Sequence, residues 1–176
     1  EDGSITVSVT FLPGDSMLES EVNLQEALNE AGSAATGECL GRFDTDGGKI
    51  EVAGRKLTTT GSKPKNYQTP YGVVRIARHV YQGSRGGATY CPLDHGARIM
   101  RTATPLFAKQ AAFKYANANA RTVVKDFAQH GRKITHSYVG EVAADVASVV
   151  AEKEHWTYAL PAAPAGSRVK TVAVGV

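Results

Sequence analysis

Seven side chains between residues 121 and 141 have the types and the spacing that a surface for a polyanion requires. They are four cations and three groups that hydrogen-bond: Arg121, Lys125, Arg132, Lys133, His136, Ser137 and Glu141. Arginine and lysine neutralise phosphates, whereas imidazole, hydroxyl and carboxylate groups can hydrogen-bond to base edges. A carboxylate such as that of Glu141 accepts from the amino group of cytosine. This set therefore predicts contacts to duplex DNA.

Two helices joined by a short turn would position these side chains. Asn119 is a favourable N-cap for a first helix that runs to about His130, and Gly131 suits the left-handed residue beyond its end. Thr135 is a favourable N-cap for the second helix, along which valines recur at helical spacing. The apolar stripe consists of Val139, Val142, Val146, Val149 and Val150.

This arrangement is typical of a helix-turn-helix. In that motif the second helix enters the major groove by its N-terminal residues, and the preceding helix and turn contact phosphates. A further helix over residues 103–118, which Thr104 caps and Pro105 begins, would support the pair as a three-helix unit. The alternative interpretation is an ordinary helical hairpin whose basic face is only solvated.

The front of the chain predicts a strand followed by a helix. Residues 5–12 alternate apolar and polar side chains, which indicates a strand. Residues 16–31 predict a helix that Ser16 caps and Gly32 ends, with a buried apolar stripe and acids that face water.

The middle of the chain predicts β-hairpins. Residues 49–60 indicate one hairpin, residues 61–68 a polar, basic link, and residues 72–82 and 88–91 two strands around a glycine-rich turn. The fold class is therefore α+β: an N-terminal strand and helix, β-hairpins, then a three-helix helix-turn-helix unit.

The charge distribution supports a division of the chain. Residues 1–50 carry ten acidic and two basic residues, whereas residues 51–150 carry five acidic and fifteen basic residues. A basic block of this kind is the electrostatic footprint that a nucleic-acid binder needs, although it can also be a solvated surface. We predict four regions: 1–60, acidic; 61–99, basic hairpins; 100–157, helical and DNA-binding; and 158–176, a linker followed by a strand.

Metal sites are not expected. Glu38, Asp44 and Asp46 lack the later ligands and the closing glutamate of a calcium loop. A zinc site needs about four Cys or His ligands, usually with a second closely spaced pair. The candidates without such pairing are Cys39, His79, Cys91 and His95. We therefore predict no metal, no cofactor, and a buried thiol at Cys91.

The composition also limits location and partners. No apolar run approaches the roughly 20 residues of a membrane span. The first residues lack a signal-peptide pattern, and two cysteines are too few for a disulfide framework. These features predict a cytoplasmic protein that has no membrane partner and no small-molecule substrate.

Four ordered blocks resemble the N-terminal region of ISKra-type insertion-sequence transposases. They are TPYGVVRIARHVYQ, TYCPLDHGARI, ATP-x-FAKQ and KDFAQHGRKITHSYV, and the resemblance runs from roughly residue 14 to residue 176. It implies a bacterial DNA transposase of the DDE type, whose front region recognises the ends of the mobile element.

The resemblance also implies where catalysis would occur. In relatives a ribonuclease-H-like domain cuts and joins DNA with acidic residues that hold two divalent metal ions. Its first catalytic aspartate would follow a strand like KTVAVGV, and the sequence ends at Val176. No catalytic acid can therefore be assigned, and no catalysis is expected from this chain alone. Related groups carry a zinc ribbon before the helices, where Cys91 is the only cysteine here.

Two other functions stay open. The chain could be a free-standing helix-turn-helix transcriptional regulator. It could also be an assembly module whose acidic helix over residues 16–31 packs on a partner protein or on a second copy of the chain.

Overall fold

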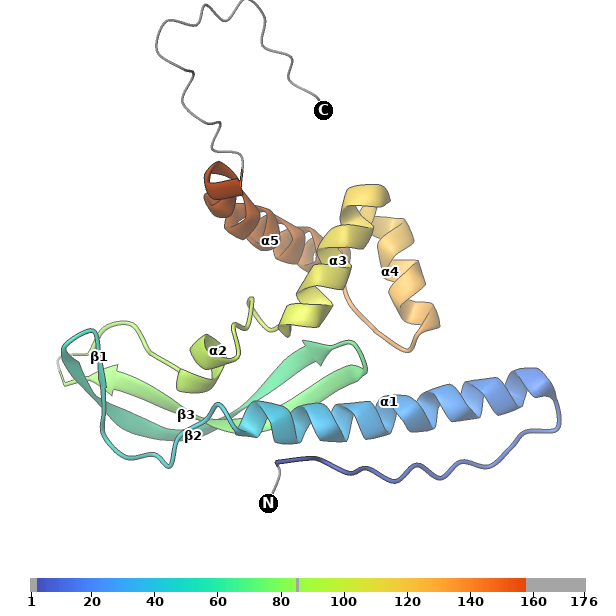
Figure 1. Ribbon diagram of the computed structural model, residues 1–176, viewed down its shortest axis with the longest axis horizontal. Coiled ribbons are helices and arrows are strands. Elements are labelled where there is room, and N and C mark those ends of the chain that lie inside the picture. Colours follow the sequence, from blue (N-terminus) through green and yellow to red (C-terminus); the bar gives the residue numbers. More distant parts are fainter. Residues whose placement is uncertain (1–2, 85, 158–176) are drawn as a thin grey trace, which may run out of the picture.

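The computed structural model describes residues 3–84 and 86–157. Within them the chain is mixed α and β, with one antiparallel sheet of strand order β1-β2-β3 and five helices. The elements are α1 (Met17–Gly41), β1 (Ile50–Val52), β2 (Arg55–Thr69), β3 (Gly72–Gly83), α2 (Pro92–Gly96), α3 (Pro105–Asn117), α4 (Ala120–Gln129) and α5 (His136–Thr157). In the view of Figure 1, α1 runs along one side of the sheet, whereas α2 and the helices α3–α5 lie on the other.

The sheet is a long ribbon of β2 and β3 with the short β1 beside one end. The predicted hairpin over residues 49–60 is present, because β1 pairs with β2 across Ala53 and Gly54, whose φ angles are 48° and 74°. The predicted strand over residues 72–82 is also present, but its partner is β2. The stretch 61–68, predicted as a link, is therefore part of a strand, and the expected boundary after residue 60 falls within it.

The reason for this difference is pairing between distant residues. β2 is polar and exposed along most of its length, so its sequence alone does not indicate a buried strand. Its backbone groups nevertheless pair with β3 from Thr69 to Leu57, with a shift in register between Thr59 and Ser62. The predicted strand over residues 88–91 is reduced to an isolated bridge between Tyr90 and Tyr81.

The segment 5–12 is not a strand, which corrects the prediction. It runs beside α1 (Figure 1), and a helix offers no row of free backbone groups for strand pairing. Two side chains hold the segment instead. Asn23 donates to the Leu12 carbonyl at 2.9 Å, and Arg42 donates to the Gly3 carbonyl at 2.8 Å.

Helix α1 begins as predicted but ends later. Ser16 caps it, since its hydroxyl accepts from the Glu19 amide at 3.1 Å. Gly32 does not end the helix. It lies within α1, and the absence of a side chain there leaves room for the Tyr71 ring at the ribbon turn. A Cβ at Gly32 would lie 2.4 Å from atoms of that ring. The helix therefore continues to Gly41.

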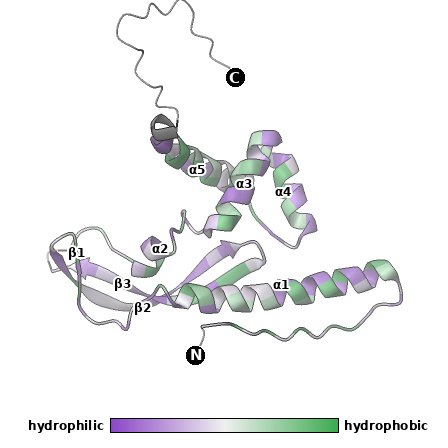
Figure 2. Cartoon of the chain, viewed as in Figure 1, coloured by the Kyte–Doolittle hydropathy of each residue, from purple (hydrophilic) through white to green (hydrophobic). Residues whose placement is uncertain are grey.

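The apolar stripe of α1 is exposed or at most half-buried, which contradicts the expected burial. Leu18 is 71% exposed, and Val22 and Leu28 are each 48% exposed. The one α1 residue that is fully buried is Leu40, at the end that packs near the sheet. Figure 2 shows hydrophobic and hydrophilic residues alternating toward the free end of the helix.

The helices α3, α4 and α5 share one core, as predicted for a three-helix unit. Its buried members are Ala103, Phe107, Ala108, Ala111, Val123, Phe127, Val139 and Val142. The rings of Phe107 and Phe127 lie 5.1 Å apart. The valine stripe leaves this core toward the end of α5, where Val149 and Val150 are exposed.

A second cluster attaches α2 to the ribbon through Asp94. This carboxylate accepts from the Tyr67 hydroxyl at 2.5 Å and from Lys65 at 2.9 Å, and Arg78 Nε lies 3.6 Å away. Burial raises the pKa of Tyr67, and the hydrogen bond to Asp94 acts in the same direction. Cys91 is buried in the same cluster, as predicted.

Candidate nucleic-acid interface

Local sequence places two basic residues on the outer face of α4. The Asn119 side chain accepts from the Thr122 amide at 3.0 Å and so begins the helix where predicted. Val123 and Phe127, four residues apart, face the core. Arg121 and Lys125, also four residues apart, therefore share another face and are exposed.

The turn after α4 and the start of α5 expose three more of the predicted residues. Gly131 has a φ of 77°, the left-handed conformation expected beyond the helix end. Thr135 caps α5, since its hydroxyl accepts from the Tyr138 amide at 3.3 Å. Lys133, His136 and Ser137 are exposed around this cap.

Arg132 lies inside the structure rather than on the exposed surface that the sequence predicts. Its side chain donates to Asn29 Oδ1 at 3.0 Å and to the carbonyl of Pro70. The residue is 8% exposed, and burial lowers the pKa of its guanidinium. Arg132 thus links the α4–α5 turn to α1 and to the ribbon, and it is not part of the exposed cationic surface.

Glu141 is exposed but already has a cationic partner. Arg101 Nη1 lies 3.0 Å from Glu141 Oε2, and Arg101 Nε lies 2.7 Å from Asp145 Oδ2. The hydrogen bond to Asp145 raises the pKa of Arg101, and the charge of Glu141 acts in the same direction. Glu141 follows Ser137 by four residues and so shares its helix face, but its carboxylate is bound to Arg101.

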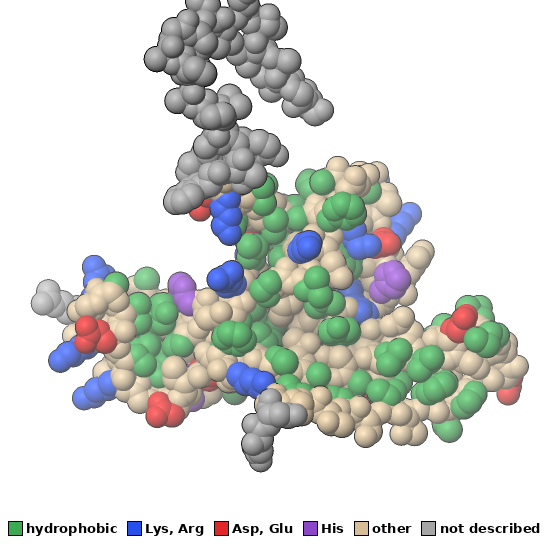
Figure 3. Space-filling view, viewed as in Figure 1, with side chains coloured by type: hydrophobic (Ala, Val, Ile, Leu, Met, Phe, Trp, Pro, Cys, Tyr) green, Lys and Arg blue, Asp and Glu red, His purple; other side chains and the backbone are tan. Residues whose placement is uncertain are grey.

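Charge is unevenly distributed over the visible face of the molecule. Figure 3 shows basic side chains together with some acidic ones over the three-helix region and at the β1 end of the sheet, whereas the charged side chains visible at the free end of α1 are acidic. Acidic residues of α1 also lie near the turn after α4, because Glu21 and Glu26 line one hollow together with His130 and Gly131.

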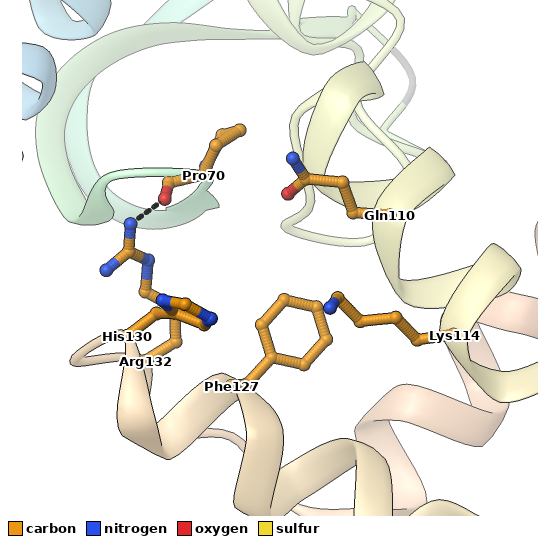
Figure 4. A pocket seen from close by; sticks show the side chains of 6 residues that line it. All are labelled: Pro70, Gln110, Lys114, Phe127, His130 and Arg132. Carbon is orange, nitrogen blue, oxygen red and sulfur yellow. Dashed lines mark hydrogen bonds between the residues drawn. The ribbon is translucent and has the colours of Figure 1, made fainter. Parts of the chain in front are cut away.

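Sequence reasoning missed a hollow of about 360 Å³ between α3, the end of α4 and the β2–β3 turn (Figure 4). It is lined by Pro70, Gln110, Lys114, Phe127, His130 and Arg132. These residues come from three separate stretches of the chain, so no local pattern could have indicated the hollow.

The described residues contain no cluster of three or more His, Cys, Asp or Glu side chains that could hold a metal ion. Asp44, one of the calcium-loop candidates, binds the edge of β3 instead. Its two carboxylate oxygens each accept from the His79 amide at 3.1 Å, and one lies 3.0 Å from the His79 ring.

In the part of the chain that the structure describes, no helix combines the length and the apolar character needed to span a bilayer. The predicted C-terminal strand after residue 166 lies outside the described residues.

Comparison with known proteins does not extend this picture. No protein-family model matches the chain, and no curated protein matches it significantly. The resemblance to ISKra-type transposases that four sequence blocks indicate stays a prediction.

Proposed function

We propose that this chain binds duplex DNA through α4, the turn after it and the start of α5, which act as a helix-turn-helix. One observation carries the proposal. Exposed cations on α4 and in the following turn come directly before α5 in the chain. The first turn of α5 is exposed, and the core that α5 shares with α3 and α4 fixes its position. That order of elements suits a recognition helix.

Each exposed residue has a role in this proposal. Arg121, Lys125 and Lys133 would neutralise phosphates and set the register of the protein on the duplex. His136 and Ser137 would hydrogen-bond to base edges in the major groove. Arg132 instead supports the turn.

Glu141 can accept from cytosine only if it exchanges its bond to Arg101 for one to the base. A base contact by Glu141 would therefore gain less free energy than one by an unpaired carboxylate.

The proposed biological role follows from the sequence blocks that resemble ISKra-type transposases. The chain would be the DNA-binding N-terminal portion of such an enzyme and would recognise the ends of the mobile element. We assign it no catalytic step of its own.

Alanine variants combined with a selection of preferred duplexes test the proposal. Lys133→Ala should weaken binding to all sequences alike, whereas Ser137→Ala and His136→Ala should change the preferred sequence. Lys49→Ala, which removes an exposed lysine beside β1 at the far end of the sheet, is the matched control and should change neither property. Unchanged affinity and preference in all three interface variants would remove the assignment.

A second candidate function, assembly with another copy of the chain, is favoured by the exposed apolar side chains at the N-terminal end. Leu12, Met17 and Leu18 are 81%, 72% and 71% exposed. Exposed apolar patches often mark interaction sites. Light scattering without DNA would show a size that increases with concentration, and Leu18→Asp would abolish the increase. A monomer at all concentrations would exclude this candidate.

A further inference from the structure

The hollow beside the β2–β3 turn gathers nitrogen groups from separate elements. Gln110 and Lys114 extend from α3, His130 stands at the end of α4, and the ring of Phe127 lies between them (Figure 4). Arg132 completes the wall beside Pro70. Three of the six lining residues are basic and none is acidic.

The charges of the hollow are only partly balanced. Lys114 Nζ lies 2.6 Å from Asp126 Oδ2 and 5.6 Å from the centre of the Phe127 ring. An ammonium group carries three N–H donors, and one carboxylate oxygen at this distance occupies one of them. Lys114 therefore keeps donors for another acceptor.

Arg132 supplies an uncompensated charge. It is 8% exposed, its neighbours Asn29 and Pro70 are neutral, and its Nη1 is buried without a hydrogen-bond partner in the part of the chain described. A buried cation with an unsatisfied donor is unfavourable unless an anion lies near it. Asp126 balances only one of the two permanent positive charges at the hollow.

We propose that the hollow binds a phosphate group. A phosphate offers several charged acceptor oxygens, which match ammonium, amide and imidazole donors that approach from different directions. The volume of about 360 Å³ leaves room for the group together with part of its hydration. A neutral or cationic ligand would leave the charge of Arg132 unbalanced.

The phosphate has two possible sources with the same chemistry. It can belong to the DNA backbone, in which case the inference rests on the proposed function. His130 and Arg132 flank Gly131 in the turn that also carries Lys133, so the same turn would hold this phosphate. Otherwise it is free orthophosphate, and the site is independent of DNA.

Two variants and one control separate these sources. Lys114→Gln removes a charge of the hollow, and His130→Gln replaces an imidazole ring that lines it. Lys109→Gln, an exposed lysine of α3 outside the hollow, is the control. Each protein is tested for its unfolding midpoint in sodium phosphate against sodium chloride of equal ionic strength. Its DNA affinity is then measured over a salt series.

For a backbone phosphate, Lys114→Gln should make the log–log salt slope less steep by about 0.9, and His130→Gln should weaken binding, while Lys109→Gln changes neither. For free orthophosphate, phosphate should raise the midpoint of the wild type and of Lys109→Gln but not that of the two hollow variants. Either result supports the site. A third result would overturn the site and leave the proposed function intact. In that case both hollow variants bind DNA as the wild type does, and phosphate does not change the unfolding midpoint. If orthophosphate raised the unfolding midpoint and the wild type bound no DNA, the phosphate site would stand and the proposed DNA-binding function would be contradicted.

Discussion

Replacing Arg132 with methionine tests whether this residue supports the fold. The substitution keeps an unbranched chain but removes the hydrogen bonds to Asn29 and Pro70. Each hydrogen bond to a charged group contributes about 1.5–3 kcal/mol, and burial of the unpaired Nη1 offsets about 1–3 kcal/mol of their sum. We therefore expect Arg132→Met to lower the free energy of unfolding by about 2–3 kcal/mol.

The matched control is its neighbour, Lys133→Met. Because Lys133 is exposed, its loss should change the free energy of unfolding by less than about 0.5 kcal/mol. Urea unfolding followed by circular dichroism measures both variants, and fluorescence anisotropy measures their affinity for DNA. If Arg132→Met kept the full stability of the wild type, the structural role of Arg132 would be refuted, whatever its effect on DNA binding.

Three further substitutions test other parts of the structure. Burial raises the pKa of Asp94, but hydrogen bonds from a tyrosine and a lysine of β2 outweigh it and lower the pKa. The contribution of this carboxylate to stability is therefore complete above its unfolded-state pKa of about 3.9 and is lost as pH falls through the lower folded value. Asp94→Asn should remove this part of the acid sensitivity, which is measured as the free energy of unfolding against pH. Gly32→Ala should destabilise the protein, because the added Cβ would overlap a tyrosine ring. Gly41→Ala, whose Cβ would have nothing within 4 Å, should raise the free energy of unfolding by up to about 1 kcal/mol. Equal urea midpoints for the two variants would contradict the packing of α1 on the ribbon. Asn119→Ala should cost about 1 kcal/mol by loss of the N-cap, and an unchanged thermal midpoint would contradict the capping role.

Local signals predicted the three-helix unit well. The cap at Asn119, the left-handed Gly131 and the position of Pro105 at the start of α3 all depend on residues within one turn of helix. Such signals act through adjacent backbone groups, so the sequence carries them directly.

The errors arise from contacts between distant parts of the chain. Residues 61–68 have the composition of a polar link, yet β3 supplies their hydrogen-bond partners. Gly32 has the composition of a helix stop, but its role is to accept the ring of Tyr71. The strand over residues 61–68 and the role of Gly32 both depend on residues that only the folded chain brings close.

The same limit applies to the candidate site. Arg121 and Lys125 are exposed as the pattern predicts, because their positions follow from helix periodicity, and Lys133 is exposed in the turn between α4 and α5. The burial of Arg132 depends on α1, roughly a hundred positions earlier in the chain. Whether a charged residue faces solvent or another element cannot be read from its own helix.

The most direct test of the central claim is fluorescence anisotropy of this chain with random duplex DNA over a salt series. Three exposed cations on α4 and the turn predict a log–log slope of about −2.7, and a phosphate held in the hollow would bring it to about −3.6. Absence of binding at the lowest salt concentration, or binding that does not change with salt, would show that these basic side chains form only a solvated surface. DNA binding by α4 and α5 would then be contradicted.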